Sequence, residues 1–519
     1  MMQPAFPGIP LAPLHGAVPA WRAEVDARQW RATCETAHST GGRLGALWGS
    51  DERDRGRGLG VRALLVLHAG LVCLELHVPE ASPAYPDVSD LFPCAGRMQR
   101  AAFDLTGIRA VTSNNHVPDP RRWLRHAAWS ETEFPLRRDF AQASGAAVDN
   151  GYEFVRVEGE GVHEIPVGPV HAGTIEPGHF RFSIVGEKLL RLEERLGYKH
   201  KGIEKRFESM TLEEGARLAG RVSGDSTVAY AWAYAMALEA LTGTRPTERA
   251  LLIRSLLLER ERVANHLGDL GYLGNDCALS FGFAQFWRLK EDVLRMNERM
   301  FTHRYLMDRI VPGGVDCDVD MEGAAALNGE ALRLKDEVRG LRSIYYNHAG
   351  LQDRCITTGR LAPDTAARLG VVGLAARASG LAMDARAHPG FAPYDRLQPK
   401  VASHRNGDVA ARIVVRFEEV FESLRLQRSI VRSLGEGALK VPLNPAPEGS
   451  FGLGWVEGWR GEVLVALEAG VAGRIRRCHP HDPSWQNWPA LEHAVIGNIV
   501  PDFPLINKSF NLSYAGADL

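Results

Sequence analysis

The segment from Leu251 to Leu273 most restricts the folds open to this chain, because it carries two neighbouring stripes of side chains at helical spacing. Such a polar stripe beside an apolar one is either a solvated helix face or a charge network buried between helices. Both interpretations require a long helix that packs against others. The polar stripe is Glu259, Arg262, His266 and Asp269, and the apolar stripe is Leu256, Val263, Leu267 and Leu270.

Other segments extend this helical pattern. A capping box, Thr211-Leu212-Glu213-Glu214, predicts one helix start, and Ser226 or Thr227 can cap a helix whose alternate residues from Ala229 to Ala237 are alanine. So many small side chains predict a close approach to another helix. We therefore predict an α+β fold whose larger part is a mainly helical bundle with small β-sheets. Further helices are predicted at 286–304, 322–345, 363–381 and 408–434.

The first part of the chain has a different pattern. Two apolar runs between Val61 and Val78, separated by His68-Ala69-Gly70, predict paired strands in a small α/β domain. Small and polar residues at 141–150 resemble a linker. We predict a flexible arm at 1–20, an α/β domain at 21–145 and the mainly helical domain at 146–519.

Composition excludes several classes of function. A net charge of −2 over 519 residues gives no basic field for nucleic acid. The seven cysteines form no CxxC pair, which argues against a disulfide framework and against a zinc or iron–sulfur site of local spacing. No apolar run approaches the roughly 20 residues of a membrane helix. The N-terminus lacks the basic region of a signal peptide.

Short segments along nearly the whole chain resemble one family. The segments include Phe103-Asp104-Leu105-Thr106-Gly107-Ile108, Pro135-Leu136-Arg137-Arg138-Asp139, Gly168-Pro169-Val170-His171, Glu176-Pro177-Gly178-His179, His200-Lys201-Gly202-Ile203-Glu204, Glu261-Arg262-Val263-Ala264-Asn265-His266 and Pro501-Asp502-Phe503-Pro504. With the segments in this order, the chain is similar to a fusion of the C and D subunits of respiratory complex I. It resembles more closely the large subunit of energy-converting nickel–iron hydrogenases of the formate hydrogenlyase and hydrogenase-4 type.

The metal ligands of that family are replaced in this chain. The resemblance places four cysteine thiolates, which suit nickel and iron, at the positions of Ser223, Ser226, Ser513 and Gly516. Hydroxyls are neutral, hard donors, and glycine has no side chain. We therefore predict no nickel–iron centre, no tightly bound cofactor in this chain and no intrinsic hydrogenase activity. Ser223 to Ser226 can also be read simply as a helix N-cap turn.

In complex I, the vacated metal cavity binds a quinone headgroup, and the resemblance extends to part of that site. His171 matches a histidine of the glycine-rich loop, but Gly224 stands where complex I has a tyrosine. The loop follows the hydrogenase form, in which Glu176 matches a glutamate that passes protons, and it also carries His179. Imidazole titrates near neutral pH, so such a loop can bond a quinone carbonyl or relay protons. It can equally be a hydrogen-bonded structural loop.

Two basic features complete the candidate site. Arg460 matches an arginine that hydrogenases place over the active site, and a buried guanidinium there needs a partner such as Asp225 or Asp502. A surface network is the alternative. The basic run of Arg474, Arg476, Arg477, His479 and His481 predicts a contact face for an acidic partner, or a solvated face.

These residues lead to one functional hypothesis and one alternative. The hypothesis is a subunit of a complex I-like (NADH:quinone oxidoreductase-like) or hydrogenase-like complex, peripheral on the cytoplasmic side of the membrane, which binds quinone or couples electron transfer to proton movement. Its expected partners are a small iron–sulfur subunit and antiporter-type membrane-arm subunits. The predicted catalytic residues are His171, Glu176, Asp225 and Arg460, and the predicted cavity lining is His171, His179, Ser223, Gly224, Ser226 and Ser513. The alternative is a purely structural, redox-inactive subunit.

Overall fold

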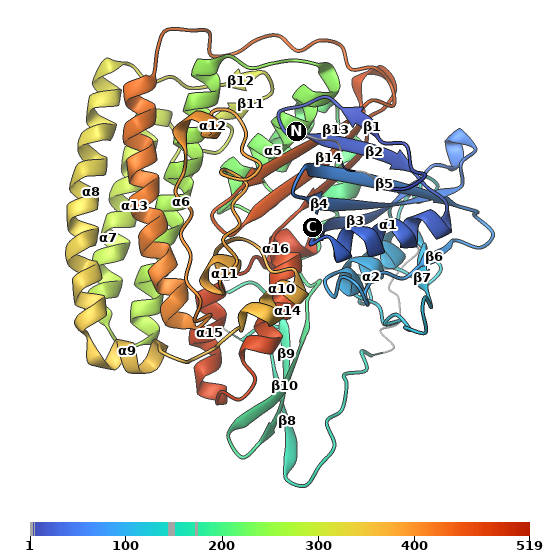
Figure 1. Cartoon of the computed structure of the whole chain (residues 1–519), viewed down its shortest axis with the longest axis horizontal. Helices are drawn as coiled ribbons and strands as arrows, with labels where there is room; N and C mark the ends of the chain where they lie inside the picture. The colour runs from blue at the N-terminus through green and yellow to red at the C-terminus, as the bar shows by residue number, and fades with distance from the viewer. Residues whose placement is uncertain (1–3, 5, 144–150, 172–174) are drawn as a thin grey trace.

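The structure is a computed structural model that describes residues 4, 6–143, 151–171 and 175–519. It is the predicted α+β fold: long helices lie on one side, a five-stranded sheet lies on the other, and a three-stranded sheet runs between them (Figure 1). Most of the predicted linker, and the predicted domain boundary inside it, fall at 144–150, outside the described residues.

The N-terminal sheet has the strand order β1-β2-β5-β4-β3, in which β2 is parallel to β5 and the other pairs are antiparallel. The predicted hairpin between Val61 and Val78 is confirmed as β4 and β5. Two helices and a short parallel pair complete this region. The elements are β1(Ala12–Leu14), β2(Ala20–Glu24), α1(Ala27–Ser39), β3(Arg43–Asp51), β4(Leu59–Leu67), β5(Gly70–Val78), β6(Ala84–Pro86), α2(Ala95–Thr106) and β7(Arg109–Val111).

The segment expected to be a flexible arm is partly built into this sheet. Residues 12–14 form β1, which pairs with β2. The side chains of Phe6 and Leu11 are buried in the main hydrophobic core. Burying two apolar side chains of this size favours an ordered position over a free arm, because their transfer from water is worth about 1.5–3 kcal/mol each.

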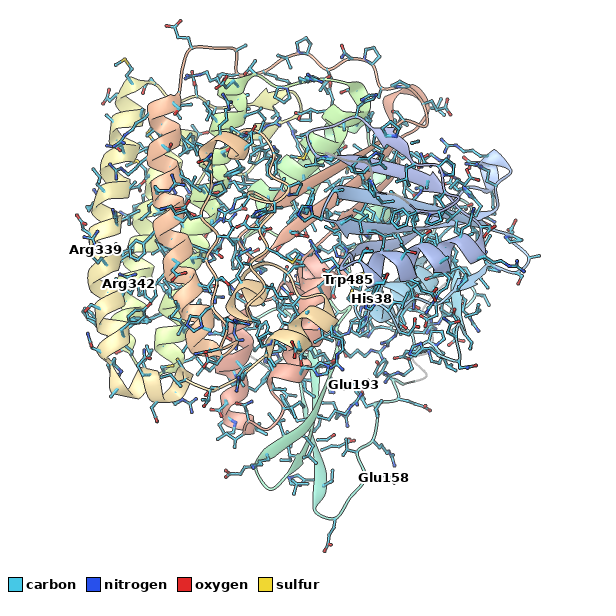
Figure 2. The ribbon with its side chains drawn as sticks, in the orientation of Figure 1. His38, Glu158, Glu193, Arg339, Arg342 and Trp485 are labelled. Atoms are coloured by element: carbon cyan, nitrogen blue, oxygen red, sulfur yellow. The ribbon has the colours of Figure 1, made fainter. Side chains whose placement is uncertain are left out.

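Four long helices form the bundle; in Figure 1 α8 lies at its outer edge, and α13 packs between α8 and α6. The side chain of Arg339 is exposed on α8, whereas Arg342 stacks over the Phe421 ring of α13 at 4.9 Å (Figure 2). The helix predicted at 363–381 is instead two short ones, since Gly370 and Gly373 between them have positive φ. The long helices are α6(Glu248–Asp276), α7(Ser280–Phe301), α8(Met321–Asn347) and α13(Val409–Ser433), and the short elements near them are β11(Ile310–Val311), β12(Gly314–Val315), α9(Ala349–Cys355), α10(Pro363–Leu369), α11(Gly373–Ala378) and α12(Tyr394–Leu397).

The polar stripe of α6 is a buried charge network and not a solvated face. Glu259, Arg262 and His266 are fully buried, and Asp269 is nearly so. His266 Nε2 lies 2.8 Å from Glu419 of α13, and Arg416 of α13 donates to Asp269 over 2.9 Å. Buried charges persist only when paired. The pairs therefore fix how α6 and α13 pack.

The alanines of α5(Thr227–Thr242) do allow a close approach, but the partner is a sheet and not another helix. Strand β13(Phe451–Glu457) crosses α5 so closely that a Cβ added at Gly454 would lie 1.8 Å from the Ala233 carbonyl oxygen. Small residues are thus needed on both sides of this contact. The sheet has the antiparallel order β13-β14-β15 and continues with β14(Glu462–Ala469) and β15(Ile475–His481).

The basic run was predicted to be a solvated face or a contact face for an acidic partner. Its residues on β15 are instead buried, and only Arg474, just before the strand, is exposed. Arg476 pairs with Glu52 of the N-terminal region over 2.7 Å, and Arg477 pairs with Glu204 over 2.7 Å. His479 stacks on Trp48, with ring centroids 4.8 Å apart. The acidic partner therefore lies within the chain itself, and the run holds the two parts together.

The remaining elements bring the candidate site together. A three-stranded antiparallel arm, β8(Val162–Val167), β9(His179–Val185) and β10(Lys188–Arg195), extends from the body with Glu193 and Glu158 along it (Figures 1 and 2). The short helices α3(Ile203–Phe207) and α4(Leu212–Ala219) precede α5. The chain closes with α14(Ser484–Ala494), α15(Phe503–Phe510) and α16(Tyr514–Asp518).

The contact between α5 and β13 gives a stability prediction. Gly454→Ala should destabilise the fold by about 1–3 kcal/mol or more, since the added methyl group would overlap the α5 backbone and could be accommodated only by moving α5 and β13 apart. The control is Gly329→Ala on the exposed face of α8, where nothing lies within 4 Å of the added Cβ. This change should be stabilising, by about 0.5–1 kcal/mol. Urea unfolding of both variants measures the difference, and equal midpoints would contradict the packing described.

Candidate functional site

A cavity of about 400 Å³ opens where the segment before α5 meets α6, α7 and the C-terminal segment. Three of the four predicted catalytic residues, Glu176, Asp225 and Arg460, line it together with Ser223, Gly224 and Ser513. Its lining is about equally polar and apolar. The remaining lining residues are Ile175, Asn265, Gly268, Asp269, Tyr272, Trp287, Lys290, Asn507, Lys508, Asn511, Leu512, Tyr514 and Ala515.

Two serines at cysteine positions meet on one wall of the cavity. The hydroxyl oxygens of Ser223 and Ser513 are 2.9 Å apart, and the Ser223 hydroxyl donates to Asp225 Oδ1 over 2.8 Å. Ser513 Oγ accepts the Gly516 N–H over 2.9 Å and so caps α16. All three bonds can form at once: the Gly516 N–H donates to Ser513, the Ser513 hydroxyl donates to Ser223, and the Ser223 hydroxyl donates to Asp225. Positions 290 residues apart are thus joined by a neutral hydrogen-bonded chain.

The Asp225–Arg460 pair predicted from the sequence is confirmed. Arg460 Nη1 donates to Asp225 Oδ1 over 2.8 Å, and Nη2 pairs with Oδ2. Arg460 Nη1 also lies 3.2 Å from the Ser226 hydroxyl, and its Nε donates to the Asn511 carbonyl. Burial alone would raise the pKa of Asp225, but the guanidinium outweighs it and holds that pKa below its usual value. Asp502 pairs instead with Arg354.

The fourth cysteine position is occupied sterically by another carboxylate. A Cβ added at Gly516 would lie 2.2 Å from Asp482 Oδ2, and this same oxygen accepts a 2.7 Å hydrogen bond from the buried Tyr230 hydroxyl. The Ser223 and Ser513 hydroxyls already bond to each other. Hard, neutral hydroxyls and a filled fourth position do not fit a nickel–iron centre that needs four soft thiolates.

The two histidines of the loop lie away from the cavity, which differs from the predicted lining. The His171 ring packs edge-on against Phe180 at 5.6 Å between centroids, and His179 lies 5.0 Å from the Phe154 ring and 3.2 Å from the Gly168 carbonyl. Burial lowers the pKa of both imidazoles. Ser226 bonds to Arg460 but does not line the cavity. Their contacts with the Phe180 and Phe154 rings thus keep both histidines out of the cavity lining.

Glu176, in contrast, joins the loop to the C-terminal segment. Its Oε2 accepts the Ala515 N–H over 3.0 Å, and Lys199 Nζ lies 4.0 Å from its other oxygen. About 38% of its side chain is exposed, so it stands at the cavity mouth. Residues 172–174 of the same loop are outside the described part of the chain.

Several cavity residues were not predicted, since they belong to no recognisable motif. Tyr272 of α6 and Trp287 of α7 form an aromatic wall, with the two rings 5.0 Å apart. Lys508 Nζ lies over the Tyr272 ring at 4.0 Å, and Lys290 Nζ lies 5.1 Å from the Trp287 ring. Two further lining residues of α6 did carry a signal: Asp269 belongs to the polar stripe, and Asn265 lies in the family segment 261–266.

A second acidic group lies just behind Asp225. Glu261 of α6 accepts hydrogen bonds from the N–H groups of Val228 and Ala229 at the start of α5, over 2.7 and 3.2 Å, and so caps that helix, whereas the predicted cap Ser226 makes no side-chain capping bond. Burial raises the pKa of Glu261 to about 8. The side chain is therefore largely a neutral carboxylic acid at pH 7.

Two family profiles match separate parts of the chain. The profile described as respiratory-chain NADH dehydrogenase, 30 Kd subunit, matches residues 23–145, and that of the 49 Kd subunit matches residues 276–447. A structural comparison gives a TM-score of 0.65 with a chain of the membrane-bound sulfane sulfur reductase, described as an archaeal respiratory membrane complex. The two are 22% identical, over 69% of this chain and 99% of that one, which shows a shared fold.

Sequence relatives extend over nearly the full length. Formate hydrogenlyase subunit 5 of Escherichia coli (strain K12) is 31% identical over 93% of this chain and 85% of its own length. Hydrogenase-4 component G of the same organism is 30% identical over 92% and 84%. The C/D subunit of NADH-quinone oxidoreductase from Phocaeicola vulgatus is 28% identical over 75% and 78%.

The pKa of Glu261 gives a prediction for infrared spectroscopy. A protonated-carboxyl C=O band assigned to Glu261 should be present at pH 7 and should disappear as the pH rises through about 8. Glu261→Gln should remove this band from the difference spectrum at neutral pH. The exposed Glu322, at the start of α8, supplies the control as Glu322→Gln, which should leave the band in place. A carboxylate signature for Glu261 at pH 6 would contradict the assignment.

Proposed function

Because the chain belongs to the family of complex I C/D fusions and formate hydrogenlyase-type large subunits, we propose that it is the metal-free large subunit of a membrane-associated oxidoreductase complex, in which its cavity binds a quinone headgroup. The observation that carries this proposal is an open, partly polar cavity at the position where the family's metal ligands are replaced. Ligand pockets of about 300–1,000 Å³ that combine apolar walls with a few placed polar groups are typical of small-molecule sites.

The cavity offers what a quinone headgroup needs. The Tyr272 and Trp287 rings supply flat apolar surface for stacking. Lys290 and the side-chain amide of Asn507 line the same space and can donate to carbonyl oxygens, whereas the Asn265 amide already donates to the Asp225 and Glu261 carbonyls. Asp225 and Arg460 neutralise each other, so an apolar ring placed against them does not have to displace water from an unpaired charge.

The ligand class and the partners are inferred from relatives. Relatives named as C/D subunits of NADH-quinone oxidoreductase support quinone as the ligand. Electrons would come from a small iron–sulfur partner subunit, since the replaced ligands leave the site without a metal centre. No helix among the described residues is long and apolar enough to cross a membrane. Contact with the membrane would therefore be made through membrane-arm subunits, with this chain peripheral on the cytoplasmic side.

Metal analysis of the native complex tests the absence of the nickel–iron centre. We expect iron from the partner subunit and no stoichiometric nickel, because neither the paired serines nor the space beside Asp482 supplies thiolates. Inductively coupled plasma mass spectrometry measures both metals in one sample, so iron is the internal control. One nickel per complex would contradict the proposal.

Filling the cavity tests quinone binding directly. A Cβ added at Gly224 meets nothing within 4 Å, so Gly224→Trp should fill the cavity without disturbing the fold. We expect menadione to quench the tryptophan fluorescence of the native complex and to bind the variant at least about tenfold more weakly, a loss of about 1.4 kcal/mol.

The matched control is Gly340→Trp on the exposed face of α8, where an added Cβ also meets nothing. It adds the same fluorophore at a distance from the cavity and should leave menadione affinity unchanged. Equal affinities of the wild-type and Gly224→Trp complexes would exclude this cavity as the binding site.

A further inference from the structure

Lys290 of α7 lies between two spaces. It lines the large cavity and also a second, small void of about 20 Å³ behind Asp225. Gly268 of α6 leaves the room for it, since an added Cβ there would lie 2.9 Å from Lys290 Nζ. The lysine thus separates the candidate ligand site from a small internal space.

Among the described residues, the ammonium group of Lys290 contacts the Trp287 ring but has no acceptor atom as a partner. No ion pair or hydrogen bond to another described residue is formed by its Nζ, whereas the nearest carboxylates are already neutralised. Asp225 pairs with Arg460, and Asp269 accepts from Arg416 and from Asn511. Burial lowers the pKa of Lys290. An ammonium group placed in this way needs an acceptor atom, and the cavity is where one can enter.

The small void connects Lys290 to Glu261, which can supply a proton. Glu261, Asn297, Arg304 and Tyr305 line it with Lys290, and its volume is enough for about one water molecule. Glu261 is largely a neutral acid at pH 7. About half of Tyr305 is exposed, so the void reaches toward solvent.

We infer that Lys290 donates a proton to the ligand oxygen that faces it, and that Glu261 restores this proton through the small void. The inference rests on the proposed quinone site. The overall reaction is quinone + 2 e⁻ + 2 H⁺ → quinol. Both electrons come from reduced iron–sulfur clusters of the partner, one proton leaves Lys290 Nζ as an O–H bond forms, and the other comes from solvent at the mouth beside Glu176. Glu261 then transfers its proton to the neutral amine and regains one from solvent.

The rate should therefore depend on pH through Lys290. The charged and titratable groups that face it belong to every neighbouring element: Asp225 before α5, Glu261 and Asp269 of α6, Arg304 after α7, Arg460 before β14, and Lys508 of α15. The wild-type rate should fall as the pH rises, since a neutral amine cannot donate a proton to the ligand. The effect should vanish in Lys290→Arg, because a guanidinium stays protonated throughout.

The test uses the native complex, reduced anaerobically with limiting dithionite and freed of excess reagent. Menadione is then added, and reoxidation of the iron–sulfur clusters is followed by absorbance. We expect Lys290→Met to slow reoxidation about a hundredfold, the usual scale for a lost general acid. Lys290→Arg should keep the menadione affinity measured by tryptophan quenching but lose the rate. Glu261→Gln should spare this first reoxidation and slow a second one that follows immediately after the same sample is reduced again. Lys335→Met on α8 is the matched lysine control.

Each outcome separates this inference from the proposed function. If the wild-type complex binds and is reoxidised by menadione while Lys290→Met keeps its rate and pH profile, the role of Lys290 is overturned and the quinone site stands. If Lys290→Met loses binding and rate in equal measure, with no pH effect in the wild type, Lys290 only holds the ligand and the proton-transfer role is overturned. If menadione neither binds to nor reoxidises the wild-type complex, both proposals are overturned.

Discussion

The pairing of Arg460 with Asp225 is the interaction on which the site depends. Arg460 lies over the Trp459 ring at 4.0 Å and is almost entirely buried, so it requires a carboxylate partner. Residue 225 is also held through its carbonyl, which accepts from the Asn265 amide and from the Trp459 indole, each over 2.8 Å. One ion pair and two hydrogen bonds thus join the turn before α5, helix α6 and the β13–β14 connection, and the Asn511 carbonyl adds the C-terminal segment.

The same geometry shows how a metal site can lose its ligands and remain ordered. Four thiolates would place negative charge beside Arg460, whereas this chain places two bonded hydroxyls there and lets Asp225 carry the charge. Asp482 fills the space at Gly516 and is held by Tyr230. Cysteine at position 516 would therefore displace a buried, hydrogen-bonded carboxylate. Restoring the sulfur atoms alone would not rebuild the donor set.

Sequence reasoning could predict what local patterns and motifs encode. Helix and strand patterns indicated the α+β fold, and two of the four replaced cysteine positions, Ser223 and Ser513, meet on the cavity wall. The need of a buried guanidinium for a carboxylate left Asp225 and Asp502 as candidate partners of Arg460, and only the structure distinguishes them. Lys290, Asp482 and the paired state of Arg476 could not be predicted, because tertiary contacts alone define them. The alanines of α5 predicted a close contact, but spacing does not tell whether a helix or a strand makes it.

The open space at Gly224 argues for a ligand site over a purely structural subunit. An unfilled volume that is open to water leaves apolar lining, such as the Tyr272 and Trp287 rings, in contact with water, which costs about 25 cal/mol per Å². Here almost any side chain at position 224 would reduce that volume without steric conflict. Keeping Lys290 beside it, half-buried and without an ion-pair partner among the described residues, adds a desolvation cost. A subunit that served only as a scaffold would gain from filling the space, whereas one that admits a ligand needs the room and the unpaired donor.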